Sequence, residues 1–312
     1  MRMMAYAEKA EKFSSALAWM SELARVNTNS RFYVYQKIWK ELIASSDLPD
    51  NGISPNQFNR LAEKYGKNSM CGAILETDEL IDIYDAFQND SNVIPISILE
   101  KIANGKFSET EEEADKPATS QPRNFLFELT VAAKFQSLGF HVKLNEDADI
   151  VFNFRNYKVF VECKRLFGEK NFEFNLRRAS DQLTERYKQF GLPKNLLGIC
   201  PIGFNLFSLT KVFNSEQLFL IASSGKAAVS KIDNTILEFV KRYNQLIMRK
   251  SPANTIGTGF YIRVPVCLPF GTGAVNRWLF FPHYEQPEKF RKISDQIGQK
   301  FERQSGLEKS LK

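Results

Sequence analysis

The chain has 312 residues, of which 43% are hydrophobic and 25% charged, and a formal net charge of +6, so it can bury a sizeable core and is expected to form two domains. It has no apolar run long enough for a membrane span, and charges interrupt the first helical pattern where a signal peptide would be apolar. The four cysteines show no C-x-x-C spacing, which predicts a reduced, cytoplasmic protein and argues against a disulfide scaffold or a zinc ribbon.

Helical patterns fill the first third of the chain. Apolar residues at helical spacing predict helices at about 5–26, 31–44, 75–87 and 95–103. Ser54-Pro55-Asn56-Gln57 reads as a capping box with proline at the first helical position. Residues 1–104 are therefore expected to form an all-helical domain.

An acidic, polar segment at 105–122 follows and is expected to be a flexible linker. It separates regions of opposite charge. Residues 1–122 carry 13 Lys and Arg against 19 Asp and Glu, a net charge of −6, whereas residues 123–312 carry 29 against 17, a net charge of +12. The basic region would attract a polyanion. The acidic helical domain suits regulation, a protein partner or self-association better than it suits gripping nucleic acid.

The basic region alternates helix and strand patterns, which predicts an α/β domain. The expected elements are a helix at 124–138, strands at about 140–145, 149–154 and 158–165, a helix at 175–190 and a strand at 196–202. Helical material within 216–250, strands at 259–266 and 277–281 and a basic helical tail at 285–301 complete the domain.

The second and third of these strands are expected to form a hairpin. A turn centred on Arg155-Asn156 pairs residues whose numbers add to 311, and Asp149 then faces Glu162 with Cβ atoms about 5 Å apart. Lys164 lies two residues further on and points to the same face. Two facing carboxylates destabilise a sheet unless something cationic lies between them, which argues for a metal.

Asp149 followed by Glu162-Cys163-Lys164, with Glu128 upstream on a helix, resembles the PD-(D/E)XK nuclease superfamily over roughly residues 123–203. The resemblance implies a three-layer, restriction-endonuclease-like core, in which helices flank a mixed central sheet. Ala148 stands where the motif has proline. Asp147 competes with Asp149 for the same role, and the pairing arithmetic favours Asp149.

The resemblance also implies the roles of the site residues. Asp149, Glu162 and the backbone carbonyl of Cys163 would bind Mg²⁺ or Mn²⁺, since hard oxygen ligands suit these cations. Lys164 would act on the attacking nucleophile and the transition state. Glu128 would complete the site, by binding a second metal or orienting water. Read from the residues alone, Glu128 borders the apolar stripe of its helix and could equally be a glutamate that reaches from the stripe to solvent.

On the helix at 175–190, Arg178, Gln182 and Arg186 share one face. The two arginines could bind phosphates, and in related families a glutamine of this helix approaches the site. The alternative is an ordinary solvated helix face.

Together these features predict a Mg²⁺-dependent endonuclease that hydrolyses phosphodiester bonds, with DNA preferred; the resemblance makes a restriction or antiviral defence role plausible. Two alternatives stay open. One is an RNA-directed nuclease with the same site, and the other is a non-catalytic nucleic-acid-binding or scaffold protein that retains the fold. The chain has no P-loop signature and only two histidines, which argues against NTP hydrolysis and histidine-rich metal sites.

Overall fold

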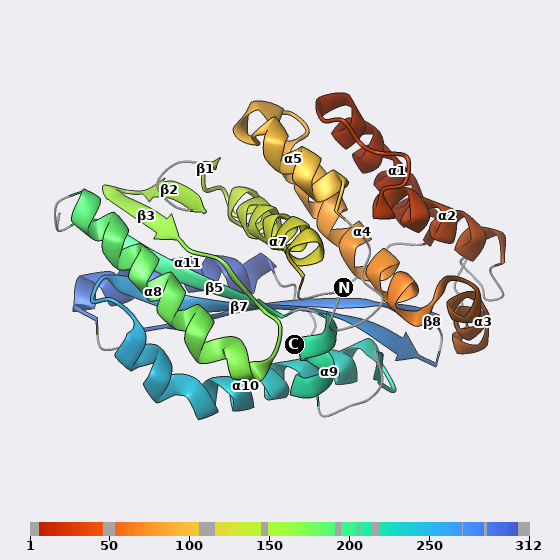
Figure 1. Cartoon of the computed structure of the whole chain (residues 1–312). Helices are drawn as coiled ribbons and strands as arrows, with labels where there is room; N and C mark the ends of the chain where they lie inside the picture. The colour runs from red at the N-terminus through yellow and green to blue at the C-terminus, as the bar shows by residue number, and fades with distance from the viewer. Residues whose placement is uncertain are drawn as a thin grey trace. The chain divides into compact units, whose positions relative to one another are not determined.

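The computed structural model describes residues 6–45, 54–105, 116–144, 149–190, 195–204, 206–213, 219–269, 271–283 and 286–304. Contacts within the chain divide it into two compact units. The first comprises Met1–Thr130, Phe213–Lys231 and Arg263–Val275, and the second comprises Val131–Val212, Ile232–Ile262 and Asn276–Lys312. Figure 1 colours the elements from red at the N-terminus to blue at the C-terminus.

Helices dominate the first unit, as the sequence predicts. They are α1 (Tyr6–Leu23), α2 (Arg31–Ala44), α3 (Pro55–Tyr65), α4 (Lys67–Phe87), the 3₁₀ turn η2 (Ser91–Val93), α5 (Ile96–Ala103) and the first part of α7 (Pro117–Ser137). The predicted cap is confirmed, because the Ser54 side chain accepts the backbone N–H of Gln57 at 3.2 Å. Helix α4 begins earlier than the apolar pattern predicts, directly after Gly66, whose φ of 84° ends α3.

The first unit also extends beyond the boundary predicted from composition. Helix α7 begins at Pro117, so the end of the segment predicted as a linker is helical; residues 106–115 lie outside the described residues. Arg123, on α7, pairs with Glu76 of α4 at 2.9 Å, and both side chains are buried. Composition cannot reveal such a pairing, because it joins residues far apart in the sequence. Separate folding of residues 1–104 stays a prediction.

The strands form one mixed sheet in the part of the chain that the structure describes. They are β1 (Val142–Leu144), β2 (Ile150–Phe154), β3 (Tyr157–Val161), β4 (Lys164–Leu166), β5 (Leu196–Phe204), β6 (Leu220–Ile221), β7 (Thr255–Leu268) and β8 (Gly271–Pro282). Their order is β1-β2-β3-β5-β7-β6, with β4 paired to β5 and β8 paired to β7. The pairs β1–β2 and β2–β3 are antiparallel, whereas β3–β5, β5–β7 and β6–β7 are parallel.

The remaining helical elements follow the hairpin strands. They are η3 (Glu169–Asn171), α8 (Phe172–Gln189), α9 (Leu206–Val212), α10 (Gly225–Lys250) and α11 (Glu288–Gln304). The predicted α/β class, with a mixed central sheet flanked by helices and a helical N-terminal region, is confirmed. None of the helices in the described ranges is long and apolar enough to cross a membrane.

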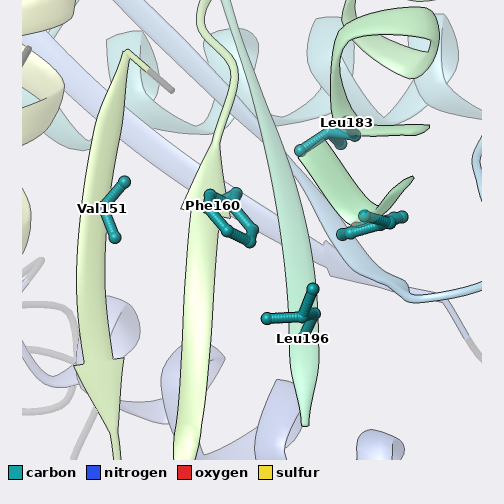
Figure 2. Packing of buried hydrophobic residues seen from close by; sticks show 5 residues of the cluster. Val151, Phe160, Leu183 and Leu196 are labelled. Carbon is teal, nitrogen blue, oxygen red and sulfur yellow. The ribbon is translucent and has the colours of Figure 1, made fainter. Parts of the chain in front are cut away.

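In the second unit, helices cover both faces of the sheet. Figure 2 shows one face, where Val151, Phe160 and Leu196 of three neighbouring strands meet Leu183 of α8. On the other face, Phe152 contacts Phe135 of α7, with ring centroids 4.9 Å apart. Neighbouring strand residues point to opposite faces, so the side chains of Val151 and Phe152 pack against different helices.

This alternation decides where the candidate site lies. Asp149 is two residues before Val151, and Glu162 is two residues after Phe160. Because side chains repeat with a period of two along a strand, both acidic residues project to the face that α8 covers.

Candidate active site

The hairpin has the register that the sequence predicts. Ile150 pairs with Val161 and Phe154 pairs with Tyr157, so the paired residue numbers add to 311. Arg155 adopts a left-handed φ of 56°, as tight hairpin turns require. Asp149 and Glu162 are the next pair beyond the end of the ladder.

The strand predicted at 158–165 is divided into β3 and β4, although its register against β5 does not change. Val161 pairs with Ile199 and Lys164 pairs with Ile202, which is the same offset. Between these pairs, the Glu162 N–H donates to the Ile199 carbonyl at 3.1 Å. The backbone of Glu162 is therefore held by the sheet even where the regular strand is interrupted.

At this interruption, a side-chain carboxylate accepts a backbone hydrogen bond. The N–H of Cys163 points away from β5 and donates to Asp149 Oδ2 at 2.7 Å. Strand β2 begins at Ile150, and the carboxylate of the preceding residue, Asp149, accepts this hydrogen bond. This bond orients Asp149 toward the hairpin.

Lys164 lies close to both carboxylates. Its Nζ lies 3.8 Å from Asp149 Oδ2 and 3.7 Å from Glu162 Oε2, and it donates to the Cys163 carbonyl at 2.9 Å. The separation between Asp149 Oδ2 and Glu162 Oε2 therefore cannot exceed the sum of their distances to Lys164 Nζ. Burial lowers the pKa of Lys164, but the charges of Asp149 and Glu162 more than offset it and leave the pKa above its usual value.

Glu162 is the most unusual group of the cluster. It is 0% exposed, and neither side-chain oxygen has a hydrogen-bond partner among the described residues. Burial, helped by the charge of Asp149, raises the pKa of Glu162 to about 7 despite the opposing effects of Lys164 and Arg186. A buried carboxylate without donors is costly unless a cation compensates for it.

The donor set fits a hard divalent cation. Asp149 and Glu162 offer carboxylate oxygens and Cys163 offers a carbonyl, and such oxygens suit Mg²⁺ or Mn²⁺. This fit depends on the two side-chain oxygens of Glu162, neither of which accepts a hydrogen bond from a described residue. No cluster of three or more His, Cys, Asp or Glu suited to a metal occurs within the described residues, so a metal at this site would depend on the two carboxylates and the Cys163 carbonyl.

For two other predicted acids, the proposed roles stay predictions. Glu128 is a half-buried residue of α7 and belongs to the first unit, so its role stays a prediction. Asp147, the competitor of Asp149, lies outside the described residues.

The three candidates on α8 differ in their surroundings. Arg186 Nε lies 3.8 Å from Glu162 Oε1. Gln182 is one turn earlier on the same face, and its amide oxygen is buried and has no hydrogen-bond partner among the described residues. Arg178 is exposed, and its guanidinium lies 5.7 Å from the ring centroid of Phe174. Arg186 is therefore the arginine of this face that lies beside a carboxylate of the cluster.

Cys200 of β5 was not singled out from the sequence. Extending the β3–β5 register by one pair places it opposite Glu162. Burial raises the pKa of its thiol to about 12, and the charges of Lys164, Glu162 and Asp149 also act on it. Only the parallel pairing of β3 with β5 could have revealed this neighbour, and no sequence pattern predicts that register.

No protein-family model matches the chain, and neither does any curated protein or solved structure.

The pKa of Glu162 has a consequence for stability. Its folded-state pKa, about 7, exceeds its ordinary value of 4.5, so ionisation of Glu162 weakens folding as pH rises through this window. Glu162→Gln cannot ionise. In EDTA at pH 8, its free energy of unfolding should exceed that of the wild type by up to about 3 kcal/mol, and the difference should vanish near pH 4.5.

Denaturant unfolding at several pH values measures this difference. Glu63→Gln is the matched control, because Glu63 is an exposed helical glutamate and its substitution should have no such pH dependence. Equal or lower stability of Glu162→Gln at pH 8 would contradict the interpretation.

Proposed function

We propose that the protein is a metal-dependent nuclease of the PD-(D/E)XK kind, which hydrolyses phosphodiester bonds and prefers DNA. One observation carries the proposal. Asp149 and Glu162 converge on Lys164, and Glu162 is fully buried without a hydrogen-bond donor among the described residues. Stability alone does not favour a buried, unsatisfied acid, so a role in chemistry is the better account.

The backbone supports each proposed metal ligand. Asp149 is oriented by the Cys163 N–H, and the backbone of Glu162 is hydrogen-bonded to Ile199. With the Cys163 carbonyl, these carboxylates would hold Mg²⁺ or Mn²⁺, which when bound would activate water and offset charge on the scissile phosphate. The ligands lie directly beside the ends of β2, β3 and β4, and these backbone hydrogen bonds keep them preorganised.

Lys164 supplies the positive charge that the transition state needs. Its side chain is only 10% exposed, and its hydrogen bond to the Cys163 carbonyl limits its movement. The neighbouring carboxylates keep the ammonium group protonated. It would therefore donate to a phosphate oxygen as negative charge develops there, an interaction that is strong in a partly desolvated site.

Charge supports a nucleic-acid substrate. Residues 123–312, which contain the site, carry a net charge of +12, from 29 Lys and Arg against 17 Asp and Glu. Binding should weaken as salt rises, because neutralised phosphates release counterions. The preference for DNA and a role in restriction or antiviral defence come from the family resemblance. The N-terminal helices are proposed to regulate the enzyme or to bind a protein partner.

Cleavage of supercoiled plasmid, single-stranded DNA and single-stranded RNA by the full chain tests the proposal. We expect DNA cleavage with Mg²⁺ or Mn²⁺ and none in EDTA. Cleavage of RNA alone would establish the RNA-directed alternative. Binding of any of these substrates without cleavage under all conditions would overturn catalysis and favour the non-catalytic alternative.

A further inference from the structure

Each oxygen of Glu162 faces a different cation. Oε2 lies 3.7 Å from Lys164 Nζ, and Oε1 lies 3.8 Å from Arg186 Nε. Both separations are longer than a hydrogen bond. Arg186 Nε is itself buried and has no hydrogen-bond partner among the described residues. The opposite charges therefore attract one another, but the hydrogen-bonding capacity of Arg186 Nε and of the Glu162 oxygens is not satisfied.

With both carboxylates ionised, the cluster is electrically balanced before any metal binds. The two negative charges of Asp149 and Glu162 face the two positive charges of Lys164 and Arg186. Buried charges are tolerated when they are compensated, and this arrangement compensates them. A divalent cation added to it would leave two uncompensated positive charges, so one of the resident cations has to leave or find a new anion.

The surroundings indicate which cation moves. Lys164 is 10% exposed and is hydrogen-bonded to the Cys163 carbonyl. Arg186 is 26% exposed, and its guanidinium also reaches Gln189 at 3.3 Å on the surface of α8. Arg186 is therefore bound less firmly at the site than Lys164, and its side chain can move toward solvent.

We propose that Arg186 is an internal counter-ion of Glu162, which gives way when a divalent cation binds and then binds the substrate phosphate. The proposal rests on the nuclease function proposed above and names the residue that couples metal binding to substrate binding. A guanidinium suits this exchange, because it pairs with a carboxylate or with a phosphate through the same planar donors. Metal alone has to displace Arg186 from Glu162, whereas the substrate phosphate gives Arg186 a new anion and offsets part of the added positive charge.

The first test is the affinity for Mn²⁺ of the full chain without nucleic acid, measured by titration calorimetry. Arg186→Gln removes the competing cation and should bind Mn²⁺ about tenfold more tightly than the wild type, or better. Arg186→Lys keeps the charge and should stay near the wild type. Arg178→Gln is the matched control, since it makes the same change at the exposed arginine of the same helix, and its Mn²⁺ affinity should change less than twofold.

The second test adds thymidine 5′-monophosphate as a phosphate probe. It should raise the Mn²⁺ affinity of the wild type and have a smaller effect on Arg186→Gln, because the residue that responds to the phosphate is gone. Arg186→Met, which keeps the aliphatic stem, replaces the glutamine variant if that variant does not fold.

The outcomes separate the two proposals. Wild-type Mn²⁺ binding with equal or weaker binding by Arg186→Gln or Arg186→Met would overturn the counter-ion role and leave the nuclease proposal standing. Absence of Mn²⁺ binding by the wild type and by every variant would overturn both, because no metal site would exist. A merely structural role for Arg186 predicts weaker metal binding in its variants, which is the opposite of the expected result.

Discussion

Lys164→Ala is expected to lower the rate of metal-dependent cleavage by at least about 100-fold, the loss that removal of one transition-state donor causes. The reason is that Lys164 lies between both carboxylates and would contact the phosphate only as its charge develops. Binding of DNA in EDTA should change little, because an interaction confined to the transition state adds nothing to ground-state affinity. Initial cleavage rates measure the first effect, and fluorescence anisotropy measures the second.

Lys170→Ala provides the matched control, because it removes one exposed positive charge from the same basic region and should retain cleavage. Circular dichroism should show Lys164→Ala to be folded. If this folded variant cleaves DNA as fast as the wild type, the mechanism assigned to the cluster is wrong.

Glu76→Ala is expected to cost about 3–5 kcal/mol of stability, the usual effect of breaking a buried ion pair. Glu76 pairs with Arg31 and with Arg123, and all three side chains are buried. Burial raises the pKa of Glu76, but the two guanidinium groups more than offset this and hold it at about 2. Removing the carboxylate leaves two buried positive charges without their anion.

Denaturant unfolding at neutral pH measures this loss, and Glu63→Ala, an exposed helical glutamate, should stay within about 0.5 kcal/mol of the wild type. The stabilisation by Glu76 should be complete above its ordinary pKa of 4.5 and should disappear as pH falls toward 2. A loss below about 1 kcal/mol at neutral pH would show that the network contributes little.

Much of the candidate site could be predicted because it is local. The turn at Arg155-Asn156 and the alternation of its flanking strands set the hairpin register, and this register carries Asp149 to Glu162. The capped helix after Ser54 and the apolar stripes of the N-terminal helices are likewise determined by residues close in the sequence.

Interactions between distant segments could not be predicted in this way. Arg263 pairs with Asp82 at 2.6 Å, and Tyr6 contacts Thr272, so a late segment of the chain belongs to the first unit. Composition instead placed the boundary in an acidic stretch, because charge and polarity report local solvation and carry no information about pairing across the sequence.

The sequence by itself determined the class of the fold, the hairpin and the identity of the acidic residues and the lysine that it brings together. Only the tertiary structure decided that Glu162 is fully buried, that Arg186 rather than Arg178 approaches it and that Cys200 lies opposite it. The physical reason is that a strand's period and a tight turn fix neighbours along the chain, whereas burial and the parallel register of β3 with β5 arise only when α8 and β5 pack against the hairpin.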